Sequence, residues 1–157
     1  MVSKFVRAPN GAVLIAGGIA LLSLAVRGAW TAVANPNHIP ILVVHLAVIG
    51  GARNAILGAA LLFIAARRSQ FAGATAVVVA TFLVFDVVLT RVMSLAFGLS
   101  APLTWSTAIY LAIAASIIGP SLFPWNSTAN KPVLFWMGLT IAALVIFAGS
   151  LALLARL

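Results

Sequence analysis

Five long apolar stretches occupy most of this 157-residue chain, and they constrain its fold more than any other feature. A helix that crosses a bilayer needs about 20 mainly apolar residues, each contributing about 1.5 Å. Stretches of this kind cover residues 12–34, 41–66, 71–97, 103–123 and 132–155. Pro residues fall mostly at the ends of the stretches or between them, where they end helices. The pattern predicts an all-α integral membrane bundle of five transmembrane helices, with residues 1–157 forming a single transmembrane domain.

The composition supports a membrane location. Apolar residues make up 64% of the chain and charged residues 6%, whereas soluble domains carry about 45–50% and about 25%. Nine Lys and Arg residues and one acidic residue cannot cover the surface of a soluble protein of this size. We therefore expect most of the surface to face lipid.

Several kinds of site are excluded by the residue counts. The chain has no Cys, one Asp, no Glu and two His residues. It therefore lacks a thiolate nucleophile and the carboxylate pair that glycoside hydrolysis requires, and we expect no transition-metal site. The basic residues lie at the ends of the apolar stretches or singly within them, so we interpret the excess of positive charge as membrane topology rather than nucleic-acid binding.

Basic residues in the short connections predict the orientation, because cytoplasmic loops are enriched in Lys and Arg. They precede the first stretch, follow the second and precede the fifth: Lys4, Arg7, Arg67, Arg68 and Lys131. We expect a cytoplasmic N-terminus and a C-terminus outside, in the bacterial inner membrane. Arg156 alone departs from the rule.

Small residues predict where helices approach one another, since close packing in lipid relies on them. The second stretch carries two adjacent stripes, one of Gly50, Asn54 and Gly58 and the other of Gly51, Ala55 and Ala59. This predicts a central position for residues 41–66. The third stretch offers Ala72, Ala76 and Ala80. The fifth has no ionisable residue between Pro132 and Leu154, so we expect it at the periphery.

Polar residues inside the stretches are the candidate functional residues, because ionisable groups in a membrane are costly. The candidate ligand-binding residues are Arg27, His45, Arg53, Asn54, Asp86, Arg91 and Tyr110. The predicted topology places all of them in the outer half of the bundle. Three Arg and one Asp leave an excess of positive charge that favours an anionic or oxygen-rich ligand. His45 and Asp86 are the only candidates for proton transfer in catalysis.

Structural interpretations of the same residues stay open. Arg27 and Arg91 can extend to the outer headgroups, and His45 can be a hydrogen-bonding structural residue. Asp86 and Arg91 are about 140° apart around a helix, so Asp86 needs a partner from another helix. Arg53 lies too deep to reach the headgroups, and an Arg53–Asp86 ion pair is the strongest pairing.

Two segments carry a resemblance to a known family. Residues 50–58, Gly-Gly-Ala-Arg-Asn-Ala-Ile-Leu-Gly, followed by Arg67 and Arg68, resemble the second-helix region of DoxX-like small membrane proteins. Residues 91–100 resemble the end of the third helix in some relatives. The resemblance covers residues 12–123, a four-helix unit, and leaves the fifth stretch outside it. It implies an association with quinone-linked oxidoreductase complexes, often as a small membrane subunit, and Arg53 and Arg91 as functional positions. The cofactor is unknown, and quinone is a candidate by this resemblance only.

Three functions remain under consideration. We favour a non-catalytic accessory or structural subunit that binds other membrane protein subunits, because the chain is small and shows no complete set of catalytic residues. The alternative is a membrane-embedded enzyme or binding protein for a quinone, a lipid or a small anionic ligand. A small proton-coupled transporter with Asp86 as its proton site is the third, although we find no internal repeat. The sequence does not decide whether the protein is an enzyme.

Overall fold

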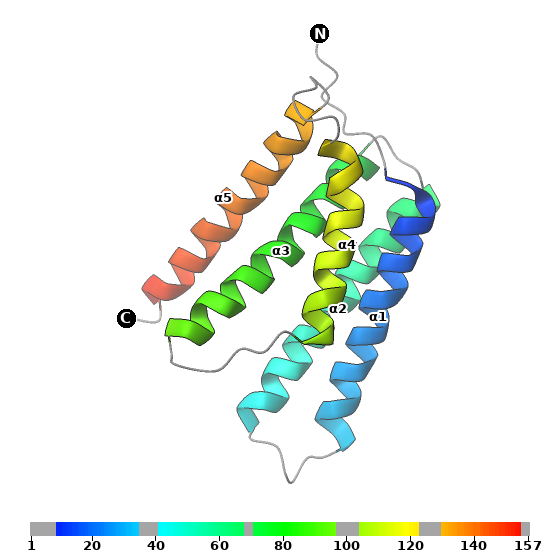
Figure 1. The fold of residues 1–157 in the computed structure, drawn as a ribbon. Helices are drawn as coiled ribbons and strands as arrows, with labels where there is room; N and C mark the ends of the chain where they lie inside the picture. Colours follow the sequence, from blue (N-terminus) through cyan, green and yellow to red (C-terminus); the bar gives the residue numbers. More distant parts are fainter. Residues whose placement is uncertain (1–8, 35–40, 68–70, 97–103, 123–129, 155–157) are drawn as a thin grey trace. The chain divides into compact units, whose positions relative to one another are not determined.

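The computed structural model describes residues 9–34, 41–67, 71–96, 104–122 and 130–154, and this part of the chain is all-helical. The helices are α1 (Gly11–Ala34), α2 (Ile41–Arg67), α3 (Ala72–Ala96), α4 (Trp105–Leu122) and α5 (Asn130–Leu154) (Figure 1). Their ends agree with the predicted stretches to within two residues. The all-α fold class and the five helices are therefore confirmed.

Three of the helices contain segments long and apolar enough to cross a membrane. These segments are Gly11–Trp30, Ala47–Arg67 and Ala72–Val92. In the described parts of α4 and α5 the apolar segments are shorter, at Trp105–Pro120 and Lys131–Ile146. The structure thus shows a helical bundle with three helices of membrane-spanning length and apolarity.

Side-chain oxygens cap two of the helices at their first turns. The amide of Ala12 donates to Asn10 Oδ1 at 3.1 Å, and the amide of Thr107 donates to Thr104 Oγ1 at 3.3 Å. The first amides of a helix have no partner within the helix, so these residues fix where α1 and α4 begin. Near the other end of α4, Pro120 removes a backbone donor two residues before the helix ends.

The chain divides into two compact units, which we describe separately. One unit spans Asn10–Ser69 and contains α1 and α2. The other contains α3, α4 and α5, within Gln70–Leu157. In the first unit, α1 and α2 form an antiparallel hairpin in extensive contact along their length (Figure 1).

Glycines allow the two helices of the hairpin to touch through their backbones. A Cβ atom added at Gly58 would lie 2.8 Å from the carbonyl oxygen of Gly18. At Gly51 it would lie 3.3 Å from the carbonyl oxygen of Ala25. At Gly28 it would lie 3.2 Å from that of Ala47. Buried Leu21 and Leu61 complete the interface.

The packed face of α2 differs in detail from the two predicted stripes. The buried residues are Gly51, Asn54, Gly58, Leu61 and Ile64, and the first three combine members of both stripes. Gly50 has nothing within 4 Å of its Cβ position, and Ala59 is exposed. The matching stripe of α1, with Gly18, Ala25 and Gly28, was not singled out from the sequence, although its spacing of seven and three residues is helical.

In the second unit, α3 packs against both other helices. Its contact with α4 is larger than its contact with α5, and α4 and α5 touch each other only slightly. Ala72, Ala76 and Ala80 are all buried, as their spacing in the sequence suggested. α4 buries a regular stripe made by Tyr110, Ile113, Ala114, Ile117 and Ile118.

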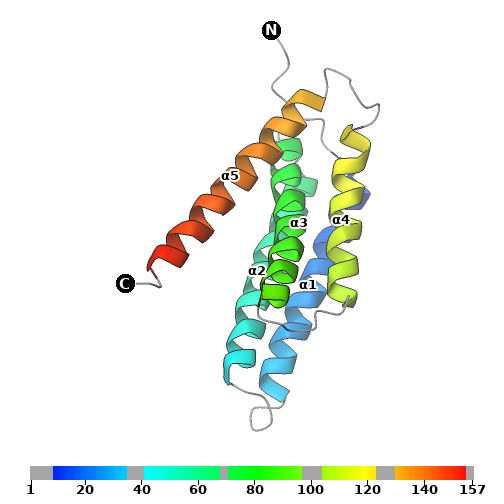
Figure 2. The ribbon, with the colours of Figure 1, turned by 60° about the vertical axis from the view of Figure 1, so that its left-hand side comes forward.

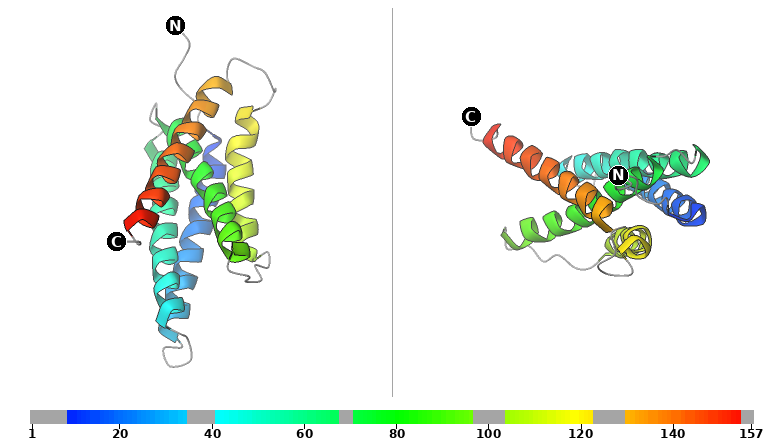
Figure 3. Two further views of the ribbon diagram at one scale, coloured as in Figure 1. Left: turned by 90° about the vertical axis from the view of Figure 1, so that its left-hand side faces the viewer. Right: turned by 90° about the horizontal axis from the view of Figure 1, so that it is seen from above.

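The contact between α3 and α5 is local. Val77 of α3 and Val133 of α5 form a buried pair, with Trp136 and Met137 packed against it. From Ile141 to Ile146 the side chains of α5 are mostly exposed. Views from two directions show α5 leaving α3 beyond this contact (Figures 2 and 3).

Candidate functional site

The polar centre of the α1–α2 hairpin lies in the middle of α2. Asn54 is 5% exposed, and Arg53 beside it is half-buried. Arg53 Nη2 donates to Asn54 Oδ1 over 3.4 Å, which is long for a hydrogen bond. The small neighbours Gly51 and Gly58 hold α1 close on the same face. The arrangement places a permanently charged guanidinium and a carboxamide at mid-helix, where both can donate to a ligand oxygen.

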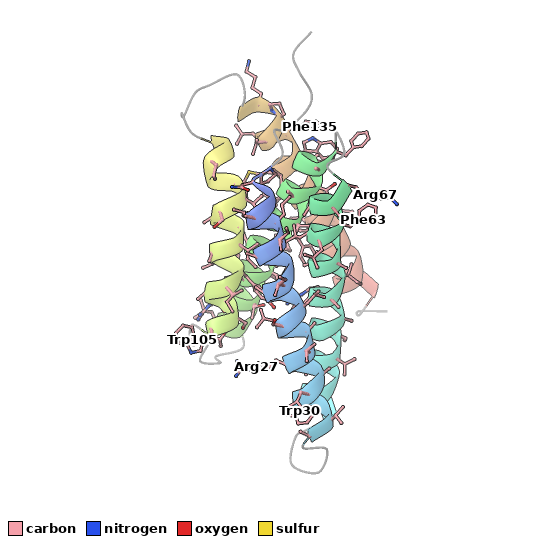
Figure 4. All side chains as sticks on the ribbon, turned by 90° about the vertical axis from the view of Figure 1, so that its right-hand side faces the viewer. Arg27, Trp30, Phe63, Arg67, Trp105 and Phe135 are labelled. Carbon is pink, nitrogen blue, oxygen red and sulfur yellow. The ribbon has the colours of Figure 1, made fainter. Side chains whose placement is uncertain are left out.

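Two other predicted residues of this unit are placed differently. Arg27 is exposed on α1, near Trp30, and Figure 4 shows both at the end of α1 that precedes the α1–α2 connection. Arg27 therefore does not line a buried centre of the hairpin. His45 belongs to α2, but its side chain lies outside the described part of the structure.

A cation–π contact marks the opposite end of α2. The guanidinium carbon of Arg67 lies 5.0 Å from the ring centroid of Phe63, one turn earlier (Figure 4). Both side chains are exposed. Arg67 also lies in the last turn of the helix, where a cation interacts favourably with the helix dipole.

In the three-helix unit, the predicted residues lie on α3 and α4. Asp86 and Arg91 are half-buried, and Tyr110 is 7% exposed. Arg91 precedes the end of α3 by five residues, and Tyr110 follows the start of α4 by five. These two ends lie at one level (Figures 1 and 2), so Arg91 and Tyr110 have the same depth in the unit. Asp86 is about 140° around α3 from Arg91.

Two polar atoms of α3 are buried and make no hydrogen bond with the described residues: Thr81 Oγ1 and Arg91 Nη2. A Thr hydroxyl inside a helix usually bonds the carbonyl four residues earlier. Thr140 in α5 does so, donating to the carbonyl of Trp136 at 2.8 Å, and Thr81 does not. Thr81 was not predicted from the sequence. The available signal was a polar residue flanked on both sides by apolar residues of α3.

Hydroxyl groups gather at the start of α4. Thr104 Oγ1 lies 2.8 Å from Ser106 Oγ and 3.0 Å from Thr107 Oγ1, besides accepting from the amide of Thr107. Their hydrogen-bonding capacity is directed to one another and to the helix end. This set therefore serves to cap α4.

The structure shows no buried polar cluster among the described residues. Arg27 is exposed, and Asp86 and Arg91 lie on different faces of α3. The described ranges also contain no group of three or more His, Cys, Asp and Glu residues that can hold a metal ion. The assignment of the individual residues to ligand binding, and the pairing of Arg53 with Asp86 across the two units, stay predictions.

The chain matches no model of a known protein family, and no curated protein and no solved structure is similar to it. The resemblance to DoxX-like proteins therefore has no support from these comparisons and stays a prediction, as does the quinone that it implies.

Proposed function

We propose that this is an integral membrane protein that acts as a non-catalytic accessory or structural subunit of a larger membrane complex. One observation carries the proposal: exposed, large apolar side chains occur on all five helices. Examples are Ile19 on α1, Ile56 on α2, Val88 on α3, Leu111 on α4 and Ile146 on α5, which are 40–69% exposed. Water does not stabilise so extensive an apolar surface, whereas lipid tails and apolar partner helices do.

In this proposal all five helices cross the bilayer of the bacterial inner membrane, with the N-terminus in the cytoplasm. The distribution of Lys and Arg supports the orientation. Exposed Trp30 and Trp105, near helix ends on the predicted outer side, suit the aromatic belt at a membrane–water interface.

The proposed partners are other membrane protein subunits, and α5 offers the surface for them. Leu134, Phe135, Leu139 and Val145 of α5 are each at least half exposed. Between Pro132 and Leu154 the helix carries no charge, so a partner helix can cover it without desolvating an ion.

The test begins with the full chain in its native membrane. Resistance to alkaline carbonate extraction is expected of an integral protein. Native mass spectrometry after gentle detergent extraction is then expected to show a stoichiometric larger partner. Release by carbonate contradicts the membrane assignment, and a chain that is retained in the membrane but purifies alone contradicts the subunit assignment.

A second candidate function is binding of a quinone, a lipid or a small anionic ligand. The pair formed by half-buried Arg53 and buried Asn54 favours it, because these groups offer several donors at mid-helix. Undiminished binding in folded Arg53→Ala and Asp86→Asn variants would exclude this function.

A further inference from the structure

The faces that α3 and α5 turn toward each other continue beyond the point where the two helices separate. Val77 is fully buried and Val133 is 1% exposed at the contact. Further along, Val88 and Val92 of α3 are 53% and 56% exposed, and Leu144 of α5, about 20° around the helix from Val133, is half-buried. Figures 2 and 3 show the helices spreading apart in this direction. The diverging faces are apolar and share no protein cover along this part.

Arg91 lies on the diverging face of α3. At about 100° per residue, Val84, Val88 and Arg91 fall within about 40° of the direction of Val77. A basic residue therefore follows two valines along the stripe that begins in the α3–α5 contact. Its side chain is half-buried, and its Nη2 atom makes no hydrogen bond with the described residues.

The sequence offers almost nothing to neutralise this guanidinium. Asp86 is the only acidic side chain in the chain, and it lies about 140° around α3 from Arg91. Neither α4 nor α5 contains an acidic residue. Arg does not lose its proton at any physiological pH, and an uncompensated charge at this depth is costly. Because no acidic side chain of α4 or α5 can compensate Arg91, an anion from outside the chain fits this position.

The depth of Arg91 indicates an amphiphilic anion. Arg91 is five residues from the end of α3, or about 7–8 Å along the axis. The Cα–Cβ bonds of a helix tilt toward its N-terminus, so the side chain starts away from the nearer end and does not easily extend to the headgroup level. A lipid phosphate that lies beside α3 at this depth can contact Arg91. The acyl chain of that lipid then extends toward the α3–α5 contact.

We propose that Arg91 binds the phosphate of a phospholipid in the leaflet at the C-terminal end of α3, and that an acyl chain of this lipid lies against the diverging faces of α3 and α5. Val84 and Val88 of α3 and Leu144 of α5 contact the chain. This inference rests on the proposed membrane insertion but not on the proposed subunit role.

Native mass spectrometry of the full-length protein, incorporated in phosphatidylglycerol nanodiscs and then released into delipidating detergent, tests the inference. The wild type is expected to retain one phosphatidylglycerol molecule per chain. Arg91→Gln is expected to weaken retention roughly tenfold, the equivalent of one charge-assisted contact. Arg67→Gln is the matched control, because it removes the same charge at the end of α2 and leaves α3 and α5 unchanged, and it is expected to retain the lipid. Equal retention by Arg91→Gln and the wild type overturns the inference.

Two further measurements extend the test. One distinguishes a lipid phosphate from inorganic phosphate, and the other keeps the inference testable if Arg91→Gln does not fold. Inorganic phosphate is expected not to displace the lipid; displacement at equal concentration would identify a soluble anion as the ligand. Val88→Trp keeps the charge and fills the path of the acyl chain, so it is expected to lose the lipid while its circular dichroism stays that of the wild type. If Arg91→Gln does not fold, lipid retention by Val88→Trp overturns the inference. Release of the wild type from membranes by alkaline carbonate would show that the chain is not inserted in the membrane. This result distinguishes failure of the proposed membrane insertion from failure of the lipid site.

Discussion

Gly58 lets the backbone of α2 reach the backbone of α1, and no larger residue fits there without movement. The nearest atom to its Cβ position is the carbonyl oxygen of Gly18, at 2.8 Å, and a backbone atom cannot turn aside as a side chain can. Helices in lipid gain little from the hydrophobic effect on association, so such close approach provides much of the attraction between them.

We predict that Gly58→Ala lowers the free energy of unfolding by about 1–3 kcal/mol, the usual cost of overpacking. Gly50→Ala is the matched control, because it is the same substitution in the same helix at a position with nothing within 4 Å. It is expected to leave stability unchanged or to raise it slightly, since Ala favours helix more than Gly. Denaturation with dodecyl sulfate in mixed micelles measures both. Equal effects of the two substitutions would contradict the close contact.

The presence of a single acidic residue, Asp86, among several Arg residues supports a second prediction about individual residues. The sequence predicts that Asp86 pairs with Arg53, and the structure does not test this pairing because the residues belong to different units. We expect Asp86→Asn to destabilise the protein by less than the roughly 3–5 kcal/mol of a fully buried pair, because it leaves a half-buried cation uncompensated. Combining it with Arg53→Gln is expected to restore part of the loss, and the double-mutant cycle measures the coupling. Additive losses would contradict the pairing.

Local side-chain contacts and a proline determine where α1 and α4 begin and where α4 ends. Asn10 and Thr104 accept from early amides of α1 and α4, and Pro120 lies just before the end of α4. These are local effects, which a sequence can reveal, and every predicted helix end lies within two residues of the observed one. The rotation of each helix about its axis is not local. The helices are apolar on most faces, so their sequences do not indicate which face packs.

This difference explains which features of the candidate site could be predicted from the sequence. Arg27, Asp86 and Arg91 were correctly placed on helices, and the depth of Arg91 follows from the end of α3. The faces were less predictable: α2 packs through Gly51 and not through Gly50, and Arg27 is exposed. A cluster requires several rotations to be right at once, and the described residues show none.

At the level of a single helix, we predict that Thr104→Ala lowers stability by about 1 kcal/mol, because α4 loses its cap. Hydrogen exchange of the Thr107 amide is the specific readout, since this amide donates to Thr104 Oγ1. Its exchange is expected to become faster in Thr104→Ala and to stay protected in Thr104→Ser. The Ala12 amide, which Asn10 caps, is the internal reference. Unchanged exchange at Thr107 would contradict the capping role.

For the whole molecule, the proposed topology can be tested cleanly because the chain has no Cys. We predict that Asn37→Cys and Ser100→Cys react with a membrane-impermeant maleimide in intact cells. Ser69→Cys and Ser127→Cys are expected to react only after the membrane is permeabilised. The wild type supplies the unlabelled background. Labelling of Ser69→Cys in intact cells would show that the orientation is reversed or that fewer helices cross the membrane.

The glycine contact between α1 and α2 joins neighbouring segments of the chain, and this bears on biosynthesis. Every residue of that interface is synthesised before α3 begins, so the hairpin can form while translation continues. Protein synthesis adds about 5–20 residues per second, which leaves several seconds for the two helices to associate before α5 emerges. A larger residue at position 58 would then act early, by giving the insertion machinery and cellular proteases two separate helices instead of one packed pair.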